Sequence, residues 1–163
     1  MRKLGIDYGD SRVGIAITDA LNITVQGLET IHHKNNDKIV LKRLDEILKN
    51  YSIDTFVVGI PINMNGTLGI RAEKTQKFIN KLKCKYKCRK VSKDSSKLVT
   101  EEGQGECSRN NKIKIETVDE RLTTVQANKT LNFLNFDKTK KKEVIDTLSA
   151  QYILETYMLT EKN

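Results

Sequence analysis

The sequence has no long apolar run, and this limits where the protein can reside. Apolar residues never extend over the roughly 18–20 positions that a bilayer-spanning helix needs. The chain begins Met-Arg-Lys-Leu-Gly-Ile-Asp, which puts a glycine and a carboxylate where a signal peptide carries its apolar stretch. We therefore expect a cytoplasmic protein without a membrane partner.

Cysteine and proline are also scarce, with three and one in the chain. The three cysteines are Cys84, Cys88 and Cys107. An odd number in a cytoplasmic chain argues against a disulfide framework. Cys84-x-x-x-Cys88 and Cys107 lack a nearby fourth zinc ligand, because His32 and His33 lie far away in the sequence. Free thiols are the default expectation, structural zinc stays an alternative, and the role of these cysteines is left open.

What the chain does contain is typical of one globular domain. Its 163 residues can bury a substantial core but are too few for two ordinary domains. Hydrophobic residues make up 37% and charged residues 31%, a balance typical of a folded protein rather than a disordered one. We expect a single domain spanning residues 1–163.

The positive charge is concentrated in one segment. The formal net charge is +8, and within Lys81–Lys114 eleven basic residues stand against four acidic ones. Clustered cations gain affinity for nucleic acids by displacing counterions from the phosphate backbone. This concentration favours a nucleic-acid partner over a generally lysine-rich, solubilising surface, which is the alternative.

Hydrophobic periodicity predicts an antiparallel meander followed by parallel crossovers. Alternating apolar residues indicate three early strands, at Lys3–Asp7, Arg12–Thr18 and Ile23–Ile31. An unbroken apolar run typical of a strand buried on both faces ends at the only proline, Pro61. The remaining elements are expected to be a helix from an N-cap at Asn36 or Asp37 to Tyr51, the Ile53–Ile60 strand, the Ile70–Leu82 helix, the Ile113–Val118 strand and two helices at Leu122–Phe133 and Glu143–Leu159.

Tyr86–Asn111 has no clean period and is rich in lysine, serine, glycine and glutamate. It is interpreted as a basic, mobile insertion at about residues 86–111. The remaining elements predict an α/β fold, with a mixed five-stranded sheet that combines the antiparallel meander with parallel crossovers and is flanked by helices.

Four carboxylates lie at the ends of apolar strands or within an apolar helix face. An unpaired carboxylate buried there would cost several kcal/mol of folding stability, so these charges are expected to have a partner or a function. Asp7 ends the first strand, Asp119 and Glu120 end the last, and Asp146 lies on the apolar seam of the final helix. Small Ser149 and Ala150 would let that helix approach the sheet closely. Three of them have an ordinary alternative: Asp7 as a turn cap, Asp119 as a helix cap, and Asp146 as a surface partner of Lys142.

Asp7, Glu120 and Asp146 can converge at one sheet edge in this topology. Three converging carboxylates would repel one another and raise their own pKa values. Mg²⁺ or Mn²⁺ removes that cost, because these hard cations prefer oxygen ligands. Two such ions roughly 3.5–4 Å apart can activate water and stabilise the leaving oxygen of a phosphodiester.

Four stretches resemble the YqgF/RuvX family, whose members are described as Holliday-junction-resolvase-like nucleases or pre-16S rRNA nucleases. They occur in the family's order, span nearly the whole chain and lie at Gly5–Asp19, Val57–Thr67, Asp119–Thr124 and Lys140–Leu154. The most specific is Asp-Glu-Arg-Leu-Thr-Thr after a strand. The clear departure is Tyr86–Asn111, where the family makes a shorter connection.

The resemblance implies a ribonuclease H-like fold and a hydrolase that cleaves phosphodiester bonds with Mg²⁺ or Mn²⁺. Carried over by position, the catalytic and metal-binding carboxylates would be Asp7, Glu120 and Asp146, with Asp119 as an alternative or auxiliary ligand. Cations beside a scissile phosphate position it and offset transition-state charge. The candidates for that role are Arg12, Arg121, Lys141 and Lys142.

The resemblance favours 5′-end maturation of pre-16S rRNA, in ribosome biogenesis, over resolution of branched DNA. A four-way junction usually demands a two-fold symmetric dimer, and the oligomeric state is left open. Two other classes stay as alternatives. One is a non-catalytic RNA- or ribosome-binding protein, which would have no evident use for the acidic set. The other is a sugar or acetate kinase, suggested by Asp7-x-Gly9, for which the chain lacks a second domain.

Overall fold

A parallel and an antiparallel half share one sheet. The computed structural model describes residues 1–61, 69–87, 113–119 and 138–161. Its five strands run in the spatial order β3-β2-β1-β4-β5. β1 pairs antiparallel with β2, and β2 with β3, whereas β4 runs parallel to both β1 and β5. Their bounds are β1 Arg2–Tyr8, β2 Arg12–Thr18, β3 Val25–His32, β4 Ile53–Ile60 and β5 Lys114–Asp119.

The expected mixed sheet is therefore confirmed, and its strand bounds differ from the prediction by two residues at most. β4 ends at Ile60, directly before Pro61. Proline has no backbone N–H to continue a ladder, which explains why the strand ends there.

The helices also lie close to their predicted positions. α1 (Asp37–Asn50) begins after Asn36, whose side chain accepts a hydrogen bond of 3.1 Å from the Lys38 backbone N–H. α2 spans Ile70–Leu82 and continues into a short π-helical segment, η1 (Lys83–Lys87). α4 (Lys138–Glu161) is longer than expected at both ends. The predicted Leu122–Phe133 helix lies outside the described residues. No helix in the described ranges has the length and apolarity needed to span a membrane.

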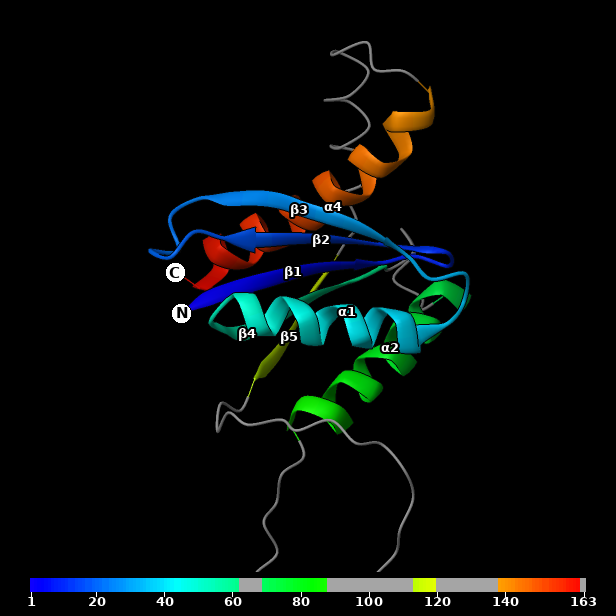
Figure 1. Cartoon of the computed structure of the whole chain (residues 1–163), viewed down its shortest axis with the longest axis horizontal. Coiled ribbons are helices and arrows are strands. Elements are labelled where there is room, and N and C mark those ends of the chain that lie inside the picture. Colours follow the sequence, from blue (N-terminus) through cyan, green and yellow to red (C-terminus); the bar gives the residue numbers. More distant parts are fainter. Residues whose placement is uncertain (62–68, 88–112, 120–137, 162–163) are drawn as a thin grey trace, which may run out of the picture.

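Helices cover both faces of the sheet (Figure 1). α1 and α2 pack on one face over the larger core, which includes Leu4, Ile6 and Phe56. α4 crosses the other face over a smaller core around Ala16, Val57 and residues of the helix itself. Successive strand residues point to opposite faces. Each strand residue can therefore be assigned to the α1/α2 face or the α4 face, and this assignment positions the site.

α4 lies unusually close to the sheet because glycines face it. A Cβ on Gly5 would be 2.6 Å from the Ala150 carbonyl oxygen, and a Cβ on Gly14 would overlap the carbonyl oxygen of Asp146. At Gly27 the nearest atom would be the Thr147 Cβ, 3.2 Å away. Ser149 and Ala150 are fully buried against this face. The close approach expected from these small residues is confirmed.

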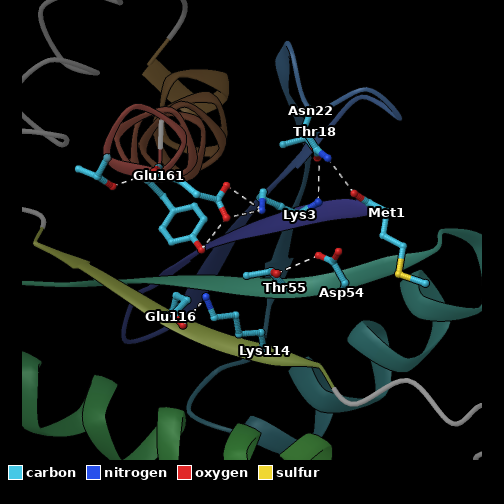
Figure 2. A network of polar contacts seen from close by, with 11 residues as sticks. Met1, Lys3, Thr18, Asn22, Asp54, Thr55, Lys114, Glu116 and Glu161 are labelled. Atoms are coloured by element: carbon cyan, nitrogen blue, oxygen red, sulfur yellow. Dashed lines mark hydrogen bonds and ion pairs between the residues drawn. The ribbon is translucent and has the colours of Figure 1, made fainter. Parts of the chain in front are cut away.

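The carboxyl end of α4 is tied to the end of the sheet where β1 starts (Figure 2). Lys3 Nζ lies 2.9 Å from Glu161 Oε2 and 5.4 Å from the centre of the Tyr157 ring. Thr18 accepts a hydrogen bond of 2.9 Å from the Lys3 backbone N–H and donates one of 2.7 Å to Asn22. The Lys3 contacts tie the carboxyl end of α4 to the start of β1, so the Asp146 end of the helix lies toward the opposite end of that strand.

Near the start of the predicted insertion, Tyr86 belongs to the packed part of the fold. Its ring meets Phe56 edge-on at 5.3 Å, and its hydroxyl donates a hydrogen bond of 2.8 Å to Asp45. Tyr86 is therefore part of the packed fold, and residues 88–111 of the predicted insertion lie outside the described residues. Of the three cysteines, Cys84 is exposed as a free thiol. Cys88 and Cys107 lie outside the described residues.

Candidate active site

Three strands bring their carboxyl ends to the same edge of the sheet, because β1, β4 and β5 are parallel. Asp7 lies near the end of β1 and pairs with Gly14 across the antiparallel ladder. Asp119 ends β5 and pairs with Ile60 of β4. This edge is where side chains from several strands can act on one substrate.

Asp7 faces α4. Its neighbours Ile6 and Leu4 are buried in the α1/α2 core, whereas Gly5 packs against Ala150 of α4. Because strand side chains alternate, Asp7 shares the face of Gly5. It is partly buried rather than fully exposed. The metal role of Asp7 and its alternative as a turn cap are both left as predictions.

Asp146 reaches the same place from α4. Its backbone carbonyl packs directly on Gly14, the register partner of Asp7. The two carboxylate-bearing residues are therefore neighbours, although they are far apart in sequence. Gly14 makes this possible, because any larger residue would hold the helix away from the strand.

Arg12 forms an ion pair with Asp146 within this site. Arg12 Nε lies 3.0 Å from Asp146 Oδ2, and the two side chains are 29% and 20% exposed. Arg12 has the same parity along β2 as Gly14, so it also faces α4. This pair joins α4 to β2 and is partly buried. The side chain of Lys142, the alternative partner of Asp146, lies outside the described residues.

Asp119, the last residue of β5, faces away from Asp7. Ile115 is buried in the α1/α2 core, and Val118 packs against the core beneath α4. Asp119 belongs to the Ile115 series and is therefore directed toward the α1/α2 face. Glu120 lies outside the described residues.

The other expected cations are described only in part. Arg121 lies outside the described residues, and Lys141 and Lys142 are described only as backbone within α4. Among the residues that the structure describes, no group of three or more His, Cys, Asp or Glu side chains could hold a metal ion. The described part of the site thus contributes two carboxylates and one guanidinium.

The two carboxylates fit a hard divalent cation. Asp7 and Asp146 supply oxygen donors, which such ions prefer, from two elements at one sheet edge. No side chain projects toward this face from Gly14 on β2 or from Gly59 on β4. Gly14 pairs with Asp7, and Gly59 pairs with Val118. The guanidinium of Arg12 already stands beside Asp146 as a positive charge, so the site accommodates a cation against these acids.

A buried histidine supports the turn between Asp7 and Arg12, and the sequence analysis did not identify it. His33 is fully buried, and its Nε2 lies 3.0 Å from the Gly9 carbonyl oxygen. Its backbone N–H donates a hydrogen bond of 3.0 Å to the Ser11 carbonyl. The only sequence signal was a histidine pair between the apolar end of β3 and the N-cap of α1. That pattern does not reveal which histidine is buried.

Behind the same turn, Tyr8 anchors β1 to the α1/α2 layer. Its ring stacks on Phe78 at 4.3 Å, and its hydroxyl donates a hydrogen bond of 2.6 Å to Asp37. Burial and this hydrogen bond raise the pKa of Tyr8 above its ordinary value. Burial alone would raise the pKa of Asp37, but hydrogen bonds from Lys81 and Tyr8 outweigh it and lower that pKa. The residues flanking Asp7 are thus held from the opposite face.

Comparison with known proteins agrees with this geometry. A family model described as "RuvX: Holliday junction resolvase" matches residues 1–102 and 89–160. The chain belongs to the RuvX family. It is 42% identical to an Acetivibrio thermocellus protein and 44% identical to one from Ruminiclostridium cellulolyticum, each named "Putative pre-16S rRNA nuclease". The matches cover 97% of this chain and 95% and 94% of those proteins.

Solved structures confirm the ribonuclease H-like fold of this RuvX family member. T. thermophilus RuvC in complex with Holliday junction substrate superposes with a TM-score of 0.51 at 11% identity, covering 100% of this chain and 96% of that one. Fowlpox virus resolvase in complex with Holliday junction DNA gives 0.54 at 13% identity, covering both chains fully. At such low identity the likeness concerns the fold alone.

Proposed function

We propose that this protein is a metal-dependent nuclease that hydrolyses phosphodiester bonds in pre-16S rRNA during 5′-end maturation. The observation that carries the proposal is the meeting of Asp7 and Asp146 on the α4 face of one sheet edge, beside the guanidinium of Arg12. The names of the 42% and 44% identical relatives support the choice of substrate.

Asp7, Asp146 and Glu120 are the proposed ligands of Mg²⁺ or Mn²⁺. When bound, such ions supply an activated water and neutralise charge on the leaving oxygen. We include Glu120 rather than Asp119 as the main ligand from this part of the chain, because Asp119 has the parity of Ile115 and is directed away from the face of Asp7. Asp119 is left as an auxiliary ligand.

Cations of this chain position the scissile phosphate in the proposed mechanism. Arg12 stands beside the carboxylates, and a guanidinium can bind two phosphate oxygens at once. Arg121, Lys141 and Lys142 extend the set along the sequence. Such cations both orient the phosphate and offset the charge that develops in the transition state. The general-base role falls to a carboxylate that accepts a proton from the attacking water.

The partner is nucleic acid, and the finer assignment is a precursor rRNA encountered in the cytoplasm, in association with assembling ribosomes. A junction DNA substrate is the second candidate, since the family model that matches this chain is described as "RuvX: Holliday junction resolvase". A purely RNA-binding protein would gain nothing from two carboxylates held together, because acids repel phosphates. The acidic pair therefore favours catalysis over simple binding.

Charge-removing substitutions test the carboxylates. Asp7→Asn, Glu120→Gln and Asp146→Asn should each lower Mn²⁺- or Mg²⁺-dependent cleavage by at least about 100-fold, since each removes charge where the metal and transition state need it. Asp10→Asn is the matched control. Asp10 is an exposed acid three residues from Asp7, and it pairs with Lys74 instead.

The same assay can separate the substrates. Pre-16S rRNA, single-stranded RNA and a four-way DNA junction are offered to one preparation, with divalent metal and with chelator. Cleavage of pre-16S rRNA that disappears with chelator is the expected result. Full activity of a folded Asp7→Asn variant would refute the proposed mechanism. Selective cleavage of the DNA junction would show that junction DNA, and not pre-16S rRNA, is the substrate.

A further inference from the structure

Arg12 lies beside Asp146, one of the two acids near Gly14 that are proposed to bind the metal ion. Its Nε is 3.0 Å from Asp146 Oδ2. Asp7 pairs with Gly14 in the sheet, and the backbone carbonyl of Asp146 packs on the same glycine, so both acidic residues adjoin Gly14. A cation beside them lowers their mutual repulsion. In the chain alone, Arg12 performs that task.

The Arg12 side chain can leave this position without disturbing the strand. Its backbone is fixed by β2 pairing and by a hydrogen bond of 2.9 Å from the Gly9 N–H to the Arg12 carbonyl. The side chain is 29% exposed and has several rotatable bonds. The guanidinium can therefore turn outward while the Cα stays in place.

A divalent cation and the guanidinium compete for the same carboxylate charge. A metal ion bound to Asp7 and Asp146 would repel the nearby guanidinium. It would also attract the Asp146 oxygen that the guanidinium contacts. A phosphate at the sheet edge offers the displaced guanidinium a new partner, with bidentate geometry.

We propose that Arg12 is a displaceable internal counter-ion: it neutralises Asp146 before the divalent cation binds, and is released toward the substrate phosphate when the cation arrives. This inference rests on the proposed metal-dependent function. It makes Arg12 a link between metal loading and phosphate capture. It also predicts that metal and substrate favour each other's binding. The cation frees Arg12 to bind the phosphate, and the phosphate holds Arg12 away from Asp146.

Mn²⁺ affinity of the free protein gives the sharpest test, because the two possible roles of Arg12 predict opposite signs. Arg12→Gln removes the competitor and should tighten Mn²⁺ binding by about twofold to fivefold, a range set by the energy of a partly exposed ion pair. Arg12→Lys keeps a competing charge and should stay within about twofold of the wild type. If Arg12 only anchored α4, Arg12→Gln would loosen Asp146 and weaken Mn²⁺ binding.

Lys3→Gln is the matched control. Lys3 and Glu161 also join the sheet to α4, at 2.9 Å, but at the far end of the helix (Figure 2). Removing that pair should lower the melting temperature without changing Mn²⁺ affinity. An equal tightening in Lys3→Gln would overturn the proposal, because the effect would then come from a looser helix.

A measurement on the unaltered protein keeps the proposal testable even if Arg12→Gln fails to fold. The ¹⁵Nε–H signal of Arg12 should shift and exchange faster with water as Mg²⁺ is added. An unmoved Arg12 signal, with Mg²⁺ binding visible at the Asp7 and Gly14 amides, would overturn the displacement.

These outcomes are distinct from failure of the proposed function. If the wild type does not bind Mn²⁺, or if Asp7→Asn leaves Mn²⁺ binding unchanged, the metal site itself is refuted. If the wild type binds Mn²⁺, Asp7→Asn abolishes binding and Arg12→Gln does not tighten it, only the counter-ion proposal is refuted.

Discussion

At the scale of single residues, the turn from Tyr8 to Ser11 is held from the side that faces away from α4. His33 lies behind it, with Nε2 3.0 Å from the Gly9 carbonyl oxygen and the ring 5.5 Å from that of Tyr8. This turn separates Asp7 from Arg12. A polar contact buried on the α1/α2 side thus fixes two residues that act on the α4 side.

His33→Leu should destabilise the protein by about 1–3 kcal/mol, because it removes a partner from a buried backbone carbonyl. It should also lower kcat at temperatures well below the melting transition, since Asp7 and Arg12 are then less well aligned. Urea unfolding and cleavage kinetics measure the two effects. His32→Leu is the matched control, because His32 is exposed. A His33→Leu variant that is less stable but retains full kcat would limit His33 to a structural role.

At the scale of elements, the packing of α4 on the sheet creates the site. Gly14 on β2 and Gly5 on β1 leave room for the helix backbone, and the buried Ile153 and Leu154 hold it there. The far end is tied by Lys3 and Glu161. Because Asp146 belongs to this helix, any change in the helix-to-sheet distance moves one carboxylate relative to the other.

Gly14→Ala should be strongly destabilising, by about 3 kcal/mol or more, because its Cβ would overlap a backbone carbonyl that cannot move independently of α4. Gly27→Ala is the matched control on the next strand. Its Cβ would meet the Thr147 side chain at 3.2 Å, and a side chain can shift slightly. Thermal unfolding of both variants measures the difference. Equal losses would show that α4 is less closely packed at Gly14 than described.

At the scale of the whole molecule, the net charge of +8 contrasts with the acidic pair in the site. The acids bind metal in the proposed mechanism, so affinity for a polyanion has to come from elsewhere on the chain. The segment Lys81–Lys114 is the concentrated source in the sequence. Tyr86 within it packs on Phe56, so a replacement that starts at residue 88 leaves this contact in place.

Replacing residues 88–112 with a short glycine-serine linker should weaken RNA binding and make its logarithmic dependence on salt concentration less steep. Fewer cations would then release fewer counterions from the phosphate backbone. Fluorescence anisotropy at several salt concentrations measures the slope, with thermal unfolding as the control for folding. An unchanged slope would assign the segment to solubility rather than substrate binding.

The sequence by itself determined the elements and most of their order. Period-2 alternation marked β1 and β2, a continuous apolar run marked β4, and Asn36 marked the start of α1. These signals are local, because propensity, capping and proline chemistry act within a few residues. The acids Asp7 and Asp146 were also recognisable, since charges within apolar patterns need a structural reason.

Only the tertiary structure decided how these residues meet. The pairing of Arg12 with Asp146 joins positions far apart in the chain, and no local pattern encodes it. The sequence placed Asp119 near the end of the last strand, but only the packed helices revealed that it faces away from Asp7. The burial of His33 likewise depends on the turn folded over it. Contacts between residues far apart in the sequence depend on how the helices pack on the sheet. The arrangement of the site could therefore be described only from the tertiary structure.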